Sequence, residues 1–167
     1  MTNMVFRDIG TDRSSIKNMG SNVLGAAVFV ITAGFAWIPV IGYFAWIIPL
    51  VVLFAEKRSL ILRFYCAEAF IIGLIRMLFD VVFNSVADIA KQTVALYGQD
   101  PGFLAFYGGE VTNAGSGALI IGGILAGILT LISLALAFMA LMRIPIRIPG
   151  ISQLCRIIAD YRFTGKK

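Results

Sequence analysis

Two oppositely charged residues, Arg76 and Asp80, stand four positions apart inside a long apolar run. On a helix this spacing places both side chains on one face, where they can pair. A charged side chain at the centre of a membrane helix costs about 2.5 to 3.5 kcal/mol on the insertion scale, so such residues are expected to pair and to face protein or water. Asn84 and Asp88 continue the i, i+4 spacing, and the four residues form a predicted polar stripe.

Two interpretations of this stripe compete. In the first, Arg76 and Asp80 are a neutralised pair that fixes helix packing; in the second, they line a hydrophilic path for an ion, a proton or a peptide. Snorkelling of the side chains to a membrane surface is a third alternative. Glu68 stands nearer the predicted cytoplasmic edge and is expected to be a solvated partner of Arg63 or Arg58.

Enzymatic chemistry is poorly supported. The chain has no histidine, which removes the usual general base and the commonest metal ligand. Its two cysteines, Cys66 and Cys155, are far apart in the sequence and are expected to be small buried apolar residues. No phosphate-binding loop is present. We therefore predict no catalytic residue, no cofactor and no metal site.

The composition is that of a membrane protein. Hydrophobic residues make up 59% of the chain and charged residues 14%, whereas about a quarter of a soluble domain is charged. The stretch from Gly115 to Met142 contains no charge, so one membrane crossing is expected there. The formal net charge of +5 is explained by basic residues beside the membrane, so we predict no nucleic-acid partner.

We predict an all-α integral membrane protein with four transmembrane helices and a C-terminal amphipathic helix at the membrane surface. A break at Pro39 divides the first apolar stretch, because proline lacks a backbone donor and disfavours helix at the preceding residue. One long kinked helix and a re-entrant hairpin are the alternatives for this stretch. The predicted spans cover residues 22–38, 41–55, 60–86 and 117–142.

Lys and Arg residues gather before the first span, in the link after Ala55 and in the tail, whereas residues 84–117 hold one lysine, Lys91. This bias places residues 1–20 and 143–167 in the cytoplasm and the loop over residues 88–116 outside. A cleaved signal peptide is the competing interpretation of the N-terminal stretch. From Gly98 to Gly117 we expect a loop whose aromatic residues dip into the membrane interface.

The last span carries small residues that let helix backbones approach closely. Internal packing is the main interpretation and a homodimer face the alternative. The residues concerned are Gly122, Gly123, Ala126, Gly127, Ser133 and Ala137.

Beyond Met142, two prolines predict an extended segment, and an amphipathic helix follows. Its predicted apolar side, which should face the lipid, consists of Ile151, Leu154, Ile158 and Tyr161. Attraction to anionic headgroups should hold the tail on the cytoplasmic leaflet. The basic residues concerned are Arg143, Arg147, Arg156 and Arg162.

Two stretches carry a family resemblance. The first is Ile48-Pro49-Leu50, then Glu56-Lys57-Arg58 and Arg63-Phe64-Tyr65-Cys66-Ala67-Glu68-Ala69; the second is Arg147-Ile148-Pro149-Gly150-Ile151. They resemble signatures of small bacterial multi-pass membrane proteins of unknown function. Those proteins are related to the twenty-kilodalton channel subunit of the chloroplast inner-envelope import translocon. The resemblance implies a compact four-helix membrane fold and, by distant analogy, a part in moving or inserting polypeptides.

We therefore expect a non-enzymatic subunit or helper of a membrane complex, placed in the bacterial cytoplasmic (inner) membrane. Other membrane protein subunits and anionic lipids are its expected partners. The alternative is a small self-sufficient ion or solute channel or transporter that uses Arg76 and Asp80.

Overall fold

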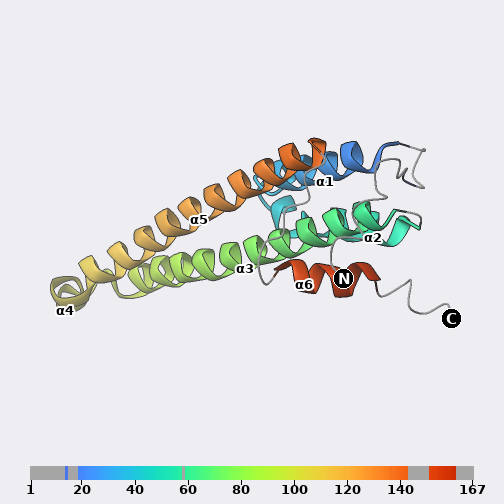
Figure 1. The fold of residues 1–167 in the computed structure, drawn as a ribbon. Helices are drawn as coiled ribbons and strands as arrows, with labels where there is room; N and C mark the ends of the chain where they lie inside the picture. Colours follow the sequence, from blue (N-terminus) through green and yellow to red (C-terminus); the bar gives the residue numbers. More distant parts are fainter. Residues whose placement is uncertain (1–13, 15–18, 58, 143–150, 161–167) are drawn as a thin grey trace. The chain divides into compact units, whose positions relative to one another are not determined.

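The computed structural model describes residues 14, 19–57, 59–142 and 151–160. The described elements are all helical, which confirms the predicted all-α class (Figure 1). In chain order they are α1 (Ser21–Phe35), η2 (Ile41–Phe44), α2 (Ile47–Ala55), α3 (Leu60–Tyr97), α4 (Pro101–Phe103), η3 (Leu104–Gly108), α5 (Gly109–Leu141) and α6 (Ile151–Asp160).

The chain divides into two compact units. The multi-helix unit comprises Met1–Leu74 and Leu131–Lys167, and the hairpin unit comprises Ile75–Thr130. Helices α3 and α5 contribute to both: the start of α3 and the end of α5 belong to the multi-helix unit, and the remainder of each helix belongs to the hairpin unit.

The predicted break in the first apolar stretch is confirmed, because α1 ends at Phe35 and α2 begins at Ile47. A single long kinked helix is therefore wrong. At the corner, Val40 has a φ of 67°, and the amide of Ile41 donates to the carbonyl of Pro39 at 2.7 Å, which closes a tight γ-turn. The 15 residues of α1 span about 22 Å, which is short of a hydrocarbon core of about 30 Å.

Helix α3 begins at a cap built from Glu56 and Ser59. The amide of Leu62 donates to Ser59 Oγ at 3.1 Å, the usual bond of a serine N-cap. Glu56 accepts from the Ser59 amide at 3.0 Å and from the hydroxyl of Ser14, and all three side chains are buried. From this cap the helix continues for 38 residues to Tyr97, well past the predicted end of the span at residue 86.

Within the multi-helix unit, α1 and α2 pack on α3 through glycines and aromatic rings. A Cβ built on Gly25 would lie 2.6 Å from Tyr65 Cδ2, so α1 approaches α3 as closely as only glycine permits. The ring of Phe29 meets Tyr65 edge-on with centroids 6.4 Å apart, and Trp46 meets Phe70 at 5.9 Å. The core of this unit is therefore aromatic and small-residue packing around the start of α3.

The loop predicted over residues 98–117 is wrong from Pro101 onward: α4, the π-helical turn η3 and the first turns of α5 follow there, and only residues 98–100 are not helical. Asp100 caps α4 by accepting from the amide of Gly102 at 2.9 Å, with Pro101 in the first turn. Glycine disfavours isolated helix, but here it allows close packing. A Cβ on Gly115 would lie 2.8 Å from Ala90 Cβ, and one on Gly122 would lie 2.9 Å from Phe83 Cβ.

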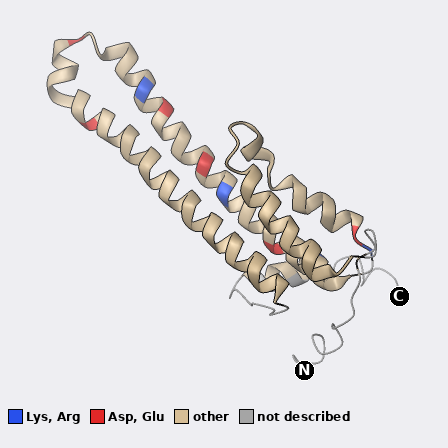
Figure 2. Ribbon diagram, turned by 90° about the horizontal axis from the view of Figure 1, so that it is seen from above, with Lys and Arg blue, Asp and Glu red and all other residues tan. Residues whose placement is uncertain are grey.

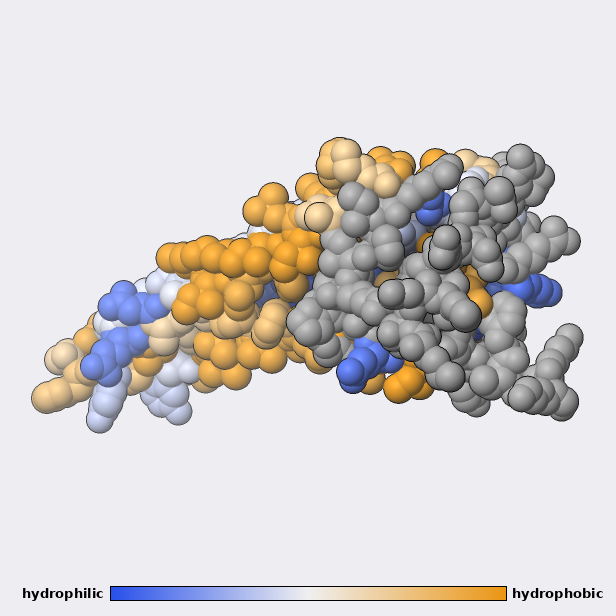
Figure 3. All heavy atoms as spheres, viewed as in Figure 1, coloured by the Kyte–Doolittle hydropathy of each residue, from blue (hydrophilic) through white to orange (hydrophobic). Residues whose placement is uncertain are grey.

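Among the described residues, one helical stretch, Pro101–Leu141, is long and apolar enough to cross a membrane by length and composition. Two shorter apolar stretches, Ser21–Phe35 and Ile41–Ala55, accompany it. Side chains of α3 and α5 leave much of the hairpin unit's surface apolar, with hydrophilic residues gathered toward the α4 end (Figure 3). The apolar residues exposed there include Val82, Ile120, Ile124 and Ile128.

Helix α6 is present as predicted, but its buried side is not the predicted apolar side. Cys155 is fully buried within the multi-helix unit, whereas Leu154 is 55% and Ile157 67% exposed. Ile151 and Ile158 are intermediate. One edge of α6 therefore packs on protein, and the exposed Leu154 and Ile157 occupy another edge. Tyr161 lies outside the described residues.

The reactivity of the Cys155 thiol measures whether α6 is packed on the multi-helix unit. Burial, with a smaller contribution from the carboxyl of Glu68, raises the pKa of the Cys155 thiol to about 12. Because the thiolate is the nucleophile, we expect Cys155 in a Cys66→Ala background to react with iodoacetamide about a hundredfold more slowly in folded than in denatured protein. Its rate should still rise between pH 9 and 10, where an ordinary cysteine of pKa about 8.5 levels off. Equal folded and denatured rates would contradict the docking.

Candidate functional site

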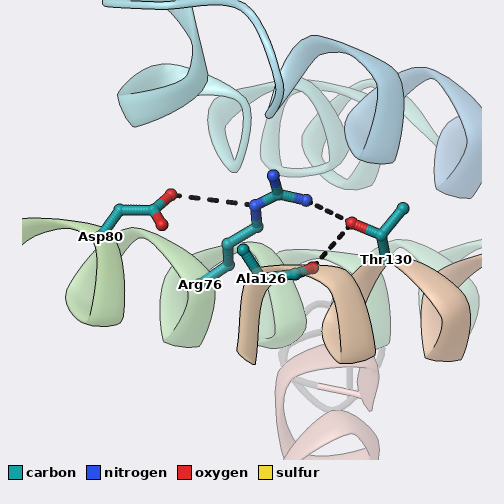
Figure 4. A network of polar contacts seen from close by, with 4 residues as sticks. All are labelled: Arg76, Asp80, Ala126 and Thr130. Carbon is teal, nitrogen blue, oxygen red and sulfur yellow. Dashed lines mark hydrogen bonds and ion pairs between the residues drawn. The ribbon is translucent and has the colours of Figure 1, made fainter. Parts of the chain in front are cut away.

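The charged pair predicted from the sequence lies inside the hairpin unit, on α3 (Figure 4). Arg76 Nε lies 3.8 Å from Asp80 Oδ2, and the two side chains are 7% and 26% exposed. This is a long i, i+4 ion pair with a buried cation and a partly accessible anion. The guanidinium therefore needs further acceptors from elsewhere in the unit.

A residue that sequence analysis missed, Thr130 on α5, supplies that acceptor. Arg76 Nη1 donates to Thr130 Oγ1 at 2.6 Å, and Thr130 Oγ1 donates in turn to the carbonyl of Ala126 at 2.8 Å. The Thr130 hydroxyl thus connects the arginine of α3 to the backbone of α5 through two hydrogen bonds. The signal available in the sequence was that the apolar part of α5, residues 118–141, holds only two hydroxyl side chains, Thr130 and Ser133.

The other two residues of the predicted stripe, Asn84 and Asp88, differ in how far they are buried. Asn84 is half-buried one turn beyond Asp80. Asp88 forms a separate pair with Lys91, with Oδ1 and Nζ 3.5 Å apart, and these side chains are 65% and 70% exposed. The structure therefore places Arg76 and Asp80 inside the unit and Asp88 at its exposed surface.

Comparison with known proteins finds no match to a family model, to a curated protein or to a solved structure. The resemblance to translocon-related membrane proteins therefore stays a prediction.

The small residues predicted to pack helices separate into two groups. Gly122 and Ala126 are buried in the hairpin unit, and Ser133 and Ala137 are buried in the multi-helix unit. In contrast, nothing lies within 4 Å of a Cβ built on Gly123 or on Gly127.

The basic residues predicted to meet lipid headgroups are largely beyond what the structure describes. Arg143, Arg147 and Arg162 lie outside the described residues, and Arg156 is described only as part of helix α6. Their attraction to anionic lipid stays a prediction.

The described part of the multi-helix unit buries three charged side chains, including Glu68, which the sequence placed near the cytoplasmic edge of the membrane. Glu68 is 1% exposed, so the expectation of a solvated side chain is wrong. Its Oε1 has no hydrogen-bond partner among the described residues. Glu56 and Arg63 are also buried, at 0% and 3% exposure. Cys155 of α6 lies within electrostatic reach of Glu68, which shows that α6 covers this part of α3.

Neither unit assembles a metal centre from its described residues, where no group of three or more His, Cys, Asp or Glu side chains is found. The Arg76–Asp80–Thr130 network lacks a nucleophile with an adjacent general base. The network neutralises a buried guanidinium and joins α3 to α5.

Proposed function

We propose that this chain is a non-enzymatic integral membrane protein, a subunit or helper of a membrane complex in polypeptide translocation or insertion. The part played in translocation follows from the family resemblance. The subunit role follows from the site. A structural charged pair and a large exposed apolar surface suit a protein that assembles with others in lipid.

The observation that carries the proposal is that Arg76 bonds to its own unit. Its guanidinium reaches both Asp80 and Thr130, and Thr130 is anchored to the carbonyl of Ala126. A side chain that lines an aqueous path should instead offer its polar atoms to water. The internal bonds therefore favour a packing role over the channel alternative.

In the proposed arrangement, α3 and α5 cross the bacterial cytoplasmic membrane, and both chain termini lie in the cytoplasm. Figure 2 shows α5 without charged residues along most of its length, as a lipid-exposed helix requires. The short helices α1 and α2 enter the membrane from the cytoplasmic side. The exposed edge of α6 with Leu154 and Ile157 rests on the inner leaflet.

The test is purification after mild solubilisation. We expect the chain, tagged and expressed at its native level, to elute with stoichiometric partner chains as a larger complex. Ion flux through vesicles that contain the purified chain alone should not exceed that of empty vesicles, and Asp80→Asn should leave it unchanged. A homo-oligomer that conducts ions and loses conductance with Asp80→Asn would overturn the proposal in favour of a channel.

A further inference from the structure

The end of the hairpin unit exposes a cluster of apolar side chains. Rings stack from α3 into the turn: Tyr97 and Phe103 have centroids 5.6 Å apart, and Phe103 and Tyr107 have centroids 6.3 Å apart. Phe106 is 78% exposed. We call this cluster the aromatic tip; it comprises Leu96, Tyr97, Phe103, Leu104, Phe106 and Tyr107.

The backbone beneath the aromatic tip is a closed turn. Asp100 accepts from the Gly102 amide at 2.9 Å and starts α4, and the π-helical turn η3 leads into α5. Thr112 then donates to the carbonyl of Gly108 at 2.8 Å. Because only residues 98–100 of the turn are not helical, the rings are presented on an ordered scaffold with little backbone entropy left to lose on binding.

A polar stretch separates the aromatic tip from the apolar part of α5. Residues 109–117 of α5 include Glu110, Thr112, Asn113 and Ser116, and the apolar run begins only at Ala118. Nine helical residues span about 13 Å, whereas the headgroup layer on each side of a bilayer is about 5 to 8 Å thick. In the proposed arrangement the tip therefore stands in water beyond the headgroups rather than in the membrane interface, and an exposed apolar cluster in water marks an interaction surface.

The charges around the aromatic tip indicate which kind of partner can bind there. Asp88 is paired with Lys91, but Asp100 and Glu110 are exposed, and residues 93–142 contain no lysine or arginine. This acidic rim repels an anionic membrane surface and also a second copy of the same tip. It attracts a cationic partner.

We propose that the aromatic tip binds a polypeptide segment whose apolar side chains are flanked by lysine or arginine. The inference rests on the proposed helper function and names the class of partner at this surface. Apolar side chains of the segment pack on Phe106 and Tyr107, and its cations lie beside Asp100 and Glu110.

The test uses the full chain in nanodiscs of zwitterionic lipid. The probe is a short fluorescent peptide with a leucine and phenylalanine centre and two lysines at each end, and anisotropy reports binding. We expect saturable binding above that of empty nanodiscs and at least tenfold weaker binding with F106S/Y107S. Asp100→Asn with Glu110→Gln should weaken it threefold or more while the asparagine keeps the helix cap. Gln92→Ala, on the exposed polar stretch of α3, is the matched control and should change nothing.

Several results would overturn the inference. They are binding no greater than to empty nanodiscs, binding insensitive to F106S/Y107S, and equal binding of the same peptide with glutamates in place of lysines. Tip-dependent clustering of vesicles would assign the surface to a second membrane, and tip-dependent dimers would assign it to a second copy. A chain that co-purifies with a complex but binds no peptide overturns this inference alone. A chain that binds the peptide but purifies alone overturns only the subunit proposal.

Discussion

Replacement of Arg76 by methionine should lower the free energy of unfolding by about 2 to 3 kcal/mol, below the usual range for a broken buried ion pair because Asp80 is partly exposed. The substitution removes the only described ion-pair partner of the Asp80 carboxylate, which lies 3.8 Å from the guanidinium. It also removes the 2.6 Å bond that joins α3 to Thr130 of α5. Unfolding in a titration from mild detergent into SDS, followed by circular dichroism, measures the change.

The double variant Arg76→Met/Asp80→Leu is the matched control. With both charges gone, no uncompensated group remains in the unit, so most of the lost stability should return. Its assembly with partner chains should also match that of the natural protein. A double variant that is stable but leaves its complex inactive would contradict the packing role and support a path through the pair.

Gly122→Leu should separate α3 from α5 in the hairpin unit and cost about 1 to 3 kcal/mol, the usual range for overpacking. Even a Cβ at this position would lie 2.9 Å from Phe83 Cβ, so a leucine side chain has no room without movement of the helices. The same SDS titration measures the loss. Combination with Phe83→Ala should restore part of it by clearing the space.

Gly123 provides the matched control one position along the same helix. Nothing lies within 4 Å of a Cβ built there, so Gly123→Leu should be tolerated. It should even gain a few tenths of a kcal/mol, because glycine is about 1 kcal/mol worse than alanine in a helix. Equal losses at both positions would mean that α5 does not face α3 through Gly122.

Local chemistry made some elements predictable from the sequence. Proline breaks a helix beyond its first turn, so Pro39 located the break between α1 and α2. The i, i+4 recurrence from Arg76 to Asp88 indicated that one helix carries these four residues, and α3 contains them all. The helix at Ile151–Asp160 followed from its amphipathic pattern.

What could not be predicted depends on contacts between segments far apart in the chain. Glycines that break isolated helices suggested a loop over residues 98–117, but Gly115 serves the close approach to Ala90. Thr130 and Arg76 are 54 positions apart in the sequence, so no local pattern could predict their hydrogen bond. Glu68 and Cys155 are buried because α6 folds onto α3, and sequence position alone placed Glu68 at a solvated edge.

Cysteine labelling on intact cells tests whether α3 and α5 cross a lipid bilayer. In a Cys66→Ala/Cys155→Ala background, one variant carries Phe106→Cys at the aromatic tip and another carries Lys57→Cys at the exposed link before α3. If both helices cross the membrane, a membrane-impermeant maleimide should label position 106 on intact cells and position 57 only after permeabilisation. Labelling of both positions from the same side would contradict this crossing.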